Sequence, residues 1–235
     1  MQRDTLSIAI VGLGPRGINV LERITAHASY GTNAPRLQLH LIDPGVPGTG
    51  IHHPDQPDYL LLNTVASQIT MFMDKTIENA GPLLPGPSLY EWAAGTQYLD
   101  SSMGSNSYLP RRLFGEYLNW VFHYLVLRLE RYCDVHLHPC EAVDLQRNSN
   151  NGFTITLTGG GSVAADYLFL TTGHTENHPD RLDREREDFV ASHHDINHFL
   201  HYVVASPYPI DQQLRDIPPS PDISSDMKKA AENRL

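Results

Sequence analysis

The chain has 235 residues, enough for one full α/β domain with a sizeable core and a short extension. Hydrophobic residues make up 40% of it and charged residues 19%, an ordinary balance that excludes wholesale disorder. The formal charge of −10, from 27 acidic against 17 basic side chains, makes nucleic acid and anionic membrane surfaces poor partners. We therefore expect neither a nucleic-acid partner nor a membrane partner.

The cysteine content and the apolar runs bear on the compartment. Cys133 and Cys140 are too few for a disulfide framework. No stretch approaches the roughly 20 apolar residues that span a bilayer. The apolar run 6–13 lacks the basic flank and cleavage site of a signal peptide. These features predict a cytoplasmic protein.

The first 43 residues read as a βαβ unit. The short β-branched run 5–11 stops at a glycine, which is typical of a buried parallel strand. Apolar residues then recur at helical spacing from Ile18 until the helix fades near Tyr30. Residues 37–42 predict a second strand, which ends at Asp43 and Pro44.

Loops and one long helix follow. Residues 44–58 predict a loop, and residues 79–107, rich in Gly, Pro and Ser, predict a long surface insertion or lid. Pro110 is placed at the first position of a helix. Its apolar stripe consists of Leu113, Tyr117, Leu118, Val121, Phe122, Leu125 and Leu129.

The remaining elements complete the fold prediction. Residues 134–138 predict a third strand, and the runs 141–147, 152–158 and 162–170 predict a meander whose last run returns to the parallel sheet. The fold class is α/β: a Rossmann-type, three-layer domain with a parallel sheet, helices on one face and a small β-meander on the other. We expect this domain at 1–178, and at 179–235 an extension whose last residues, about 15 of them, are disordered.

The most specific motif is the GxGxxG sequence directly after the first strand. Gly12 permits a tight turn, Gly14 lets the backbone approach a pyrophosphate, and Gly17 lets helix and strand pack closely. The free amides around Pro15 and Arg16, where the helix begins, favour bound phosphate. The carboxylate of Asp43, at the end of the second strand, is suited to accept hydrogen bonds from a ribose diol. The unit therefore predicts dinucleotide binding.

The order of elements favours FAD over NAD. A β-meander interrupts the sheet before the strand that ends at Thr172 and Gly173, which is the plan of flavoproteins with two dinucleotide-binding domains. In that plan the Thr-Gly turn closes over the flavin nucleotide. Val143, just after the third strand, stands where such folds bind adenine through the main chain.

Longer motifs carry a resemblance to a known family. The stretches IAIVGLGPRGINVLER, LIDPGVPGTG, DQPDYLLLNTVASQITMF, YLPRRLFGEYL, LFLTTGH and SPYPI resemble, in this order, the FAD/NAD(P)-binding family, which includes FAD-dependent urate hydroxylase and nitrosuccinate-forming aspartate N-monooxygenase. The resemblance implies FAD as cofactor and a small-molecule substrate. The implied FAD contacts are Gly12, Gly14, Pro15, Arg16, Gly17, Asp43, Pro44, Gly48, Thr49, Gly50, Asn63, Thr64, Val143, Thr172 and Gly173.

The chain also departs from the family. Members continue past the SPYP segment into a second glycine motif, whereas this chain runs from Pro218 into a polar tail, so it looks truncated after the FAD domain. Its other glycine cluster, Gly159 to Gly161, opens no helix, so no NADPH site is visible. Either a second chain or a homo-oligomer completes the enzyme, or the flavin is reduced in trans, or it does no redox chemistry.

Two classes of function remain open. The leading hypothesis is a flavin-dependent monooxygenase, or a subunit of one, acting on a small polar or nitrogenous substrate. The alternative is a shortened flavoprotein that uses FAD structurally or for a non-redox step such as a cyclisation, or a non-catalytic half that needs a partner chain.

No side chain can be assigned as the catalyst. His52 or His53 could act as a general acid or base, although loop histidines more often have no catalytic role. Arg111 and Arg112 are balanced between ligand binding and ordinary surface roles. No metal site is expected, because the histidines near the C-terminal end lack a carboxylate or thiolate framework; these are His193, His194, His198 and His201.

Overall fold

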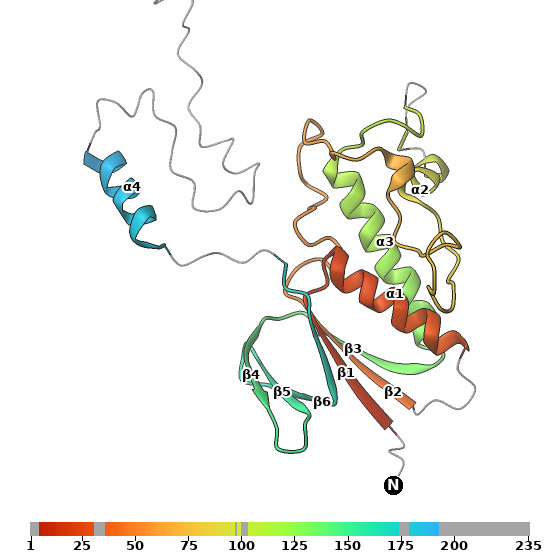
Figure 1. Cartoon of the computed structure of the whole chain (residues 1–235), viewed down its shortest axis with the longest axis vertical. Helices are drawn as coiled ribbons and strands as arrows, with labels where there is room; N and C mark the ends of the chain where they lie inside the picture. The colour runs from red at the N-terminus through yellow and green to blue at the C-terminus, as the bar shows by residue number, and fades with distance from the viewer. Residues whose placement is uncertain (1–4, 31–35, 97, 100–102, 174–178, 193–235) are drawn as a thin grey trace, which may run out of the picture. The chain divides into compact units, whose positions relative to one another are not determined.

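A computed structural model describes residues 5–30, 36–96, 98–99, 103–173 and 179–192 (Figure 1). The chain divides into two compact units, Met1–Thr175 and Glu176–Leu235. The domain boundary predicted at residue 178 remains a prediction. Across the described residues, no helix combines the length and the apolarity that crossing a bilayer requires.

The first unit is built on a four-stranded parallel sheet in the order β3-β2-β1-β7. A second, antiparallel sheet has the order β4-β5-β6. The strands are β1 (Thr5–Val11), β2 (Arg36–Ile42), β3 (Cys133–His138), β4 (Ala142–Arg147), β5 (Phe153–Leu157), β6 (Ser162–Ala165) and β7 (Tyr167–Leu170). The helices are α1 (Pro15–Tyr30), α2 (Leu89–Gly95), α3 (Arg111–Leu129) and, in the second unit, α4 (Arg181–Ser192), with a 3-10 turn η1 (Ala66–Gln68).

The alternation of side chains along β1 and β2 separates two cores. Ile10, Leu39 and Leu41 point into the larger core, with the helices. Their neighbours Ala9 and Ile42 point to the other face and pack against the antiparallel sheet. Figure 1 shows α1 and α3 on one face of the parallel sheet and the meander on the other. The predicted α/β fold with three layers is therefore confirmed.

Helix α3 forms the centre of the larger core. The stripe predicted for it is buried along its whole length: Leu113, Tyr117, Leu118, Val121, Phe122, Leu125 and Leu129 are each at most 3% exposed. One detail of the prediction is wrong, because Pro110 caps the helix and Arg111 is its first residue. Proline has no N–H to donate, so both positions suit it.

The description of residues 79–107 as a surface insertion is also wrong in part. Leu84, Leu89, Trp92 and Ala93 are buried in the same core as α3. Helix α2 begins at a capping box in which Ser88 and Glu91 satisfy each other's backbone amides. The scattered large apolar residues of this Gly- and Pro-rich stretch anchor it against the helices.

The last predicted β run, 162–170, is two strands. β6 belongs to the meander, and β7 pairs in parallel with β1. The break falls at Asp166, whose amide donates to the carbonyl of Ser7 at 2.8 Å. Its carboxylate accepts from the amide of Ser7 at 3.0 Å. The predicted return to the parallel sheet is thus confirmed for residues 167–170 only.

In the second unit the structure describes one helix, which the sequence did not predict. At its start Asp180 and Asp183 accept each other's amide hydrogens at 2.9 and 3.1 Å. The pairs Arg181–Glu185 and Asp183–Arg186 lie along α4. The predicted disordered end and the four histidines 193, 194, 198 and 201 lie outside the described residues.

Candidate functional site

The glycine-rich turn at the carboxyl end of β1 requires glycine at position 12. This residue has φ +92°, and an added Cβ would lie 2.5 Å from the carbonyl oxygen of Thr171. The Gly12 amide donates to the carbonyl of Ile42 at 2.9 Å, which joins the turn to β2. The end of β7 therefore packs directly on the turn, as a Rossmann fold requires.

Gly17 lets the helix begin immediately behind the turn. A Cβ at this position would lie 2.2 Å from the carbonyl oxygen of Gly12. Helix α1 starts at Pro15, and its first turn contains no acidic residue. The first amides of a helix have no acceptor within the helix, so the amides of Arg16 and Gly17 give this end partial positive charge. An anion is the natural ligand here.

Asp43 ties the turn to the chain after β2. One carboxylate oxygen accepts the Leu13 amide at 2.6 Å, and the other accepts the Gly45 amide at 2.8 Å. The sequence predicted only a ribose contact for this residue. Because a carboxylate has about four acceptor positions, Asp43 retains capacity for a ligand hydroxyl. Pro44, which follows it, is exposed.

Thr171 is a residue of this edge that the sequence analysis missed. Its hydroxyl donates toward the carbonyl of Gly12 at 2.6 Å and also lies 3.1 Å from the carbonyl of Val11. The available signal was a hydroxyl at the end of the apolar run of β7. The predicted residues Thr172 and Gly173 come next and are exposed, and Gly173 has φ +77°.

The loop of Gly48, Thr49 and Gly50 lies against the same turn. The Gly48 amide donates to the carbonyl of Leu13 at 2.8 Å. A Cβ on Gly14 would lie 3.4 Å from the Cα of Gly50. On its other side, Gly48 is so close to α3 that a Cβ would lie 2.5 Å from the carbonyl oxygen of Leu118. Both loops are therefore held at fixed positions by backbone contact.

The other predicted residues lie apart from the turn. Asn63 and Thr64 belong to a segment that hydrogen-bonds the chain just before α3, with Leu62 donating to Leu109 at 2.9 Å. Val143 lies in the irregular pairing of β4 with β5 and is 59% exposed. Among the described residues, no hydrogen bond joins Asn63, Thr64 or Val143 to the glycine turn.

Two buried polar atoms without a partner follow the Gly48–Gly50 loop. They are Nδ1 of His52 and Oε1 of Gln56. The His52 ring packs edge-on against Phe114, with ring centroids 4.8 Å apart. Burial, followed by the charges of Arg111 and His53, lowers the pKa of His52 to about 4. His52 is therefore neutral near pH 7, where it is a weak base and not an imidazolium donor.

Arg111 and Arg112 have partners within the chain. Arg111 donates from Nε to the carbonyl of Leu61 at 3.2 Å. Arg112 is paired with Asp58 and, at 3.1 Å, with Glu116. These ion pairs favour an ordinary surface role for Arg112 over ligand binding.

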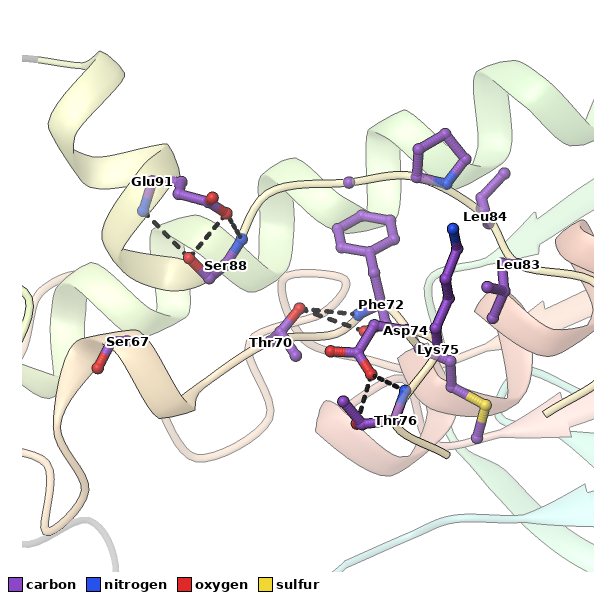
Figure 2. Close-up of a pocket in the computed structure, with 13 residues that line it drawn as sticks. Ser67, Thr70, Phe72, Asp74, Lys75, Thr76, Leu83, Leu84, Ser88 and Glu91 are labelled. Carbon is purple, nitrogen blue, oxygen red and sulfur yellow. Dashed lines mark hydrogen bonds between the residues drawn. The ribbon is translucent and has the colours of Figure 1, made fainter. Parts of the chain in front are cut away.

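A pocket of about 750 Å³ opens on the helix side of the unit (Figure 2). It lies between two segments that belong to the loop after η1 and to the approach to α2. Its lining is Ser67, Thr70, Phe72, Met73, Asp74, Lys75, Thr76, Leu83, Leu84, Pro85, Gly86, Ser88 and Glu91. In the described ranges, no group of three or more His, Cys, Asp or Glu side chains is arranged to hold a metal ion.

The residues at the carboxyl edge of β1, β2 and β7 fit a dinucleotide. The turn leaves no room for a side chain at Gly12 or Gly17, the start of α1 offers amides to a phosphate, and Asp43 offers acceptors to a ribose. Two unpartnered buried polar atoms stand beside the Gly48–Gly50 loop. The turn around Gly159 to Gly161 joins β5 to β6 and, as predicted, precedes no helix.

Comparisons with known proteins agree with this fit. The chain is 34% identical over 207 residues to the nitrosuccinic acid synthase npaA of Aspergillus oryzae, covering 87% of this chain and 31% of that protein. It is 35% identical over 191 residues to an L-aspartate N-monooxygenase (nitrosuccinate-forming) of Streptomyces cremeus, covering 72% of this chain and 29% of that one. The chain thus spans about a third of the length of these curated relatives.

A solved structure of S-allyl-L-cysteine S-oxygenase from Allium sativum is similar over 75% of this chain and 38% of its own, with 16% identity and a TM-score of 0.47. A family model described as FAD-NAD(P)-binding matches residues 9–175. This range contains the glycine turn, both loops that contact it and the meander. The predicted FAD cofactor is confirmed with it, and the chain belongs to the FAD-NAD(P)-binding family.

Proposed function

We propose that this chain is the FAD-binding part of a flavin-dependent monooxygenase that acts on a small nitrogenous substrate. The observation that carries the proposal is the turn from Gly12 to Gly17, where backbone atoms occupy the space of any side chain and the start of α1 is left for an anion. The substrate class is taken from the relatives, two of which are named for nitrosuccinate formation.

In this proposal the predicted residues have distinct roles. The backbone of Gly12, Gly14, Pro15, Arg16 and Gly17 would hold the pyrophosphate, and Asp43 and Pro44 would flank the adjacent ribose. Val143 would bind adenine through its main chain. Thr172 and Gly173 would lie over the flavin nucleotide. Gly48, Thr49, Gly50, Asn63 and Thr64 would lie along the ribityl chain and the flavin ring.

When bound, FAD would supply the oxygen chemistry, which side chains cannot provide. The chain would supply position and exclusion of water. The buried Thr49 and the close contact between Gly14 and Gly50 support a rigid, tightly packed wall on this side. His52, neutral because its pKa is lowered to about 4, is suited to form a hydrogen bond with a ligand through its unpartnered Nδ1.

Reducing equivalents would come from outside the described residues. A nicotinamide nucleotide needs a second phosphate-binding turn, and the turn of Gly159 to Gly161 leads into β6 instead of a helix. NADPH would then act at a further segment of polypeptide, at a second copy of this chain or at a separate reductase.

The test is the visible spectrum of the purified chain after incubation with FAD and gel filtration. We expect flavin bands at equimolar FAD in the unmodified chain and in Gly95→Ala, whose added Cβ meets nothing within 4 Å. We expect none in Gly17→Ala. A folded chain that retains no FAD would sink the proposal. If FAD is retained, a second measurement follows oxygen uptake by the photoreduced complex. Uptake that depends on L-aspartate would distinguish a monooxygenase from a flavoprotein without redox function.

A further inference from the structure

We propose that the free edge of β7 is a self-association surface, where a second copy of this chain adds its own β7 in antiparallel orientation. The edge combines backbone groups that lack a partner strand with large apolar side chains that are exposed. The residues of β7, Tyr167–Leu170, are outside those assigned to FAD, so this role is independent of the proposed function.

One side of β7 has no partner strand within the described residues. In the sheet order β3-β2-β1-β7 it pairs with β1 alone. The amide of Thr171 donates to the carbonyl of Val11 on β1 at 2.8 Å. Because successive residues of a strand direct their backbone groups to opposite sides, the amides and carbonyls of Leu168 and Leu170 face away from β1. These groups are suited to pair with another strand.

The side chains of β7 are apolar and exposed. Tyr167 is 57% exposed, Phe169 40% and Leu170 61%. In the register of the sheet, Tyr167 and Phe169 lie beside Ile8 and Ile10, so both rings are on the face that packs against the helices elsewhere. Strands of parallel sheets are normally buried on both faces, so this exposure indicates a surface that associates.

The other edge of the same sheet is protected by charge. On β3, Asp134 forms an ion pair with Arg36 of β2 at 2.6 Å. Natural sheets use charged side chains of this kind to prevent edge-to-edge association. Residues 167–173 contain no charged side chain, in a chain whose formal charge is −10. Two copies can therefore meet at β7 without bringing like charges together along the paired strands.

The spacing of the outward-facing groups is self-complementary. With a two-fold axis at Phe169, Leu168 of one copy lies opposite Leu170 of the other, and the symmetry repeats the contact. Each of these pairs exchanges both N–H···O bonds, so every outward amide and carbonyl of the two residues is used. Phe169 then lies opposite its own counterpart at a non-hydrogen-bonded position, where side chains are closest. The two exposed rings cover each other.

The experiment tests this register with single cysteines. Phe169→Cys places two thiols opposite each other, with Cα atoms about 4.5–5.5 Å apart, a separation that a disulfide bridges. Oxidation with diamide should then give a covalent dimer on a non-reducing gel. Tyr167→Cys, on the same face of the same strand, is the matched control. It lies opposite Thr171 of the other copy, about 13 Å along the strands from its counterpart, so it should give no dimer.

The background of this experiment is the unmodified chain, which contains Cys133 and Cys140. The contact is short, so we expect a dissociation constant of about 10–100 µM, measured by sedimentation equilibrium. The cross-linking is therefore carried out at about 100 µM, where the dimer is populated.

A second pair of variants tests the backbone. Leu170→Pro removes an outward amide and spares the pairing with β1, so it should weaken dimerisation about tenfold or more. Leu137→Pro is the matched control on β3. The carbonyl of His138 accepts the amide of Asp43, so Leu137 also directs its amide to a free edge, and this variant should dimerise normally. Circular dichroism checks that each variant is folded.

Three outcomes would overturn the proposal. Equal cross-linking of Phe169→Cys and Tyr167→Cys would show that the copies do not meet in this register. Unchanged dimerisation of a folded Leu170→Pro variant would place the contact on another surface. A chain that stays monomeric at all concentrations would leave the edge of β7 to a different polypeptide.

Discussion

At the carboxyl edge of β1, β2 and β7 the chain is held by backbone atoms: amides, carbonyl groups and the spaces of missing Cβ atoms. In the pocket of Figure 2, side chains from two stretches of chain, 67–76 and 83–88, and from the first turn of α2 form the lining. The first arrangement is set by geometry and tolerates little change. The second is formed by side chains at the surface, which can be altered residue by residue without loss of the fold.

The largest expected effect is at the glycine turn. Gly17→Ala places a Cβ 2.2 Å from the carbonyl oxygen of Gly12, a contact that only a backbone shift can relieve. We expect a loss of about 3 kcal/mol or more in the free energy of unfolding, measured by urea titration. Gly95→Ala, with open space around its Cβ, is the control. Equal stability of the two variants would show that the turn is not rigid.

The hydroxyl of Thr171 tests whether any side chain supports this edge. Thr171→Val keeps the shape but removes the donor to the carbonyl groups of Gly12 and Val11. We expect a loss of about 1–2 kcal/mol in the free energy of unfolding, from chemical denaturation. Thr158→Val removes an exposed hydroxyl with a 3.3 Å contact and should cost under about 0.5 kcal/mol. A reversed order of these two losses would contradict this role.

Acid should lower the free energy of unfolding through two partly buried histidines. His52 follows the Gly48–Gly50 loop, and His40 lies on β2. Burial foremost lowers the pKa of each to about 4; the nearby Arg111 and His53 contribute for His52, and His136 and His138 for His40. Between pH 6.5 and 4 the unfolded chain binds protons that the folded chain does not, so stability falls as pH falls, by at most about 1.4 kcal/mol per pH unit for each proton.

The pH effect is measured by urea titration at several pH values in this window. His52→Gln and His40→Gln should each flatten the slope, whereas Gln146→Ala, an exposed and non-titrating position on β4, should not. A slope that both histidine variants leave intact would assign the acid sensitivity to other groups.

The smallest effect is expected beside the pocket. Ser88→Ala removes the cap of α2 and one of the two hydrogen bonds that fix Glu91, and should lower the free energy of unfolding by about 1 kcal/mol. FAD binding, measured by absorbance, should be unchanged. Loss of FAD in this variant would show that the two regions are coupled and would remove the contrast between them.

The parts predicted from sequence are those with local signals. The strand, glycine turn and helix of residues 5–30 have a pattern that predicts the geometry, and the stripe of α3 predicts which face is buried. The anchoring of residues 79–107 could not be predicted, because it depends on distant partners. Leu89 donates to the carbonyl of Ile69 at 2.8 Å, and the Tyr117 hydroxyl donates to that of Pro87 at 2.7 Å.

The pocket and Thr171 were missed for the same reason. In the sequence, Asp74, Lys75 and Glu91 look like ordinary charged surface residues. They line one cavity only because the chain returns through residues 83–91. Thr171 acts on a carbonyl group 159 residues earlier in the chain, a relation that no local spacing expresses.

The hydrogen bond between Ser7 and Asp166 spans 159 residues, and β1 pairs on that side only with β7. β1, an inner strand of the sheet, is therefore made long before the strand that completes its pairing. During synthesis, one edge of β1 stays unpaired until residues 167–170 have left the ribosome, and contacts of such sequence separation slow folding. We expect the nascent chain to depend on chaperones until the meander has emerged and delivered β7 to its place.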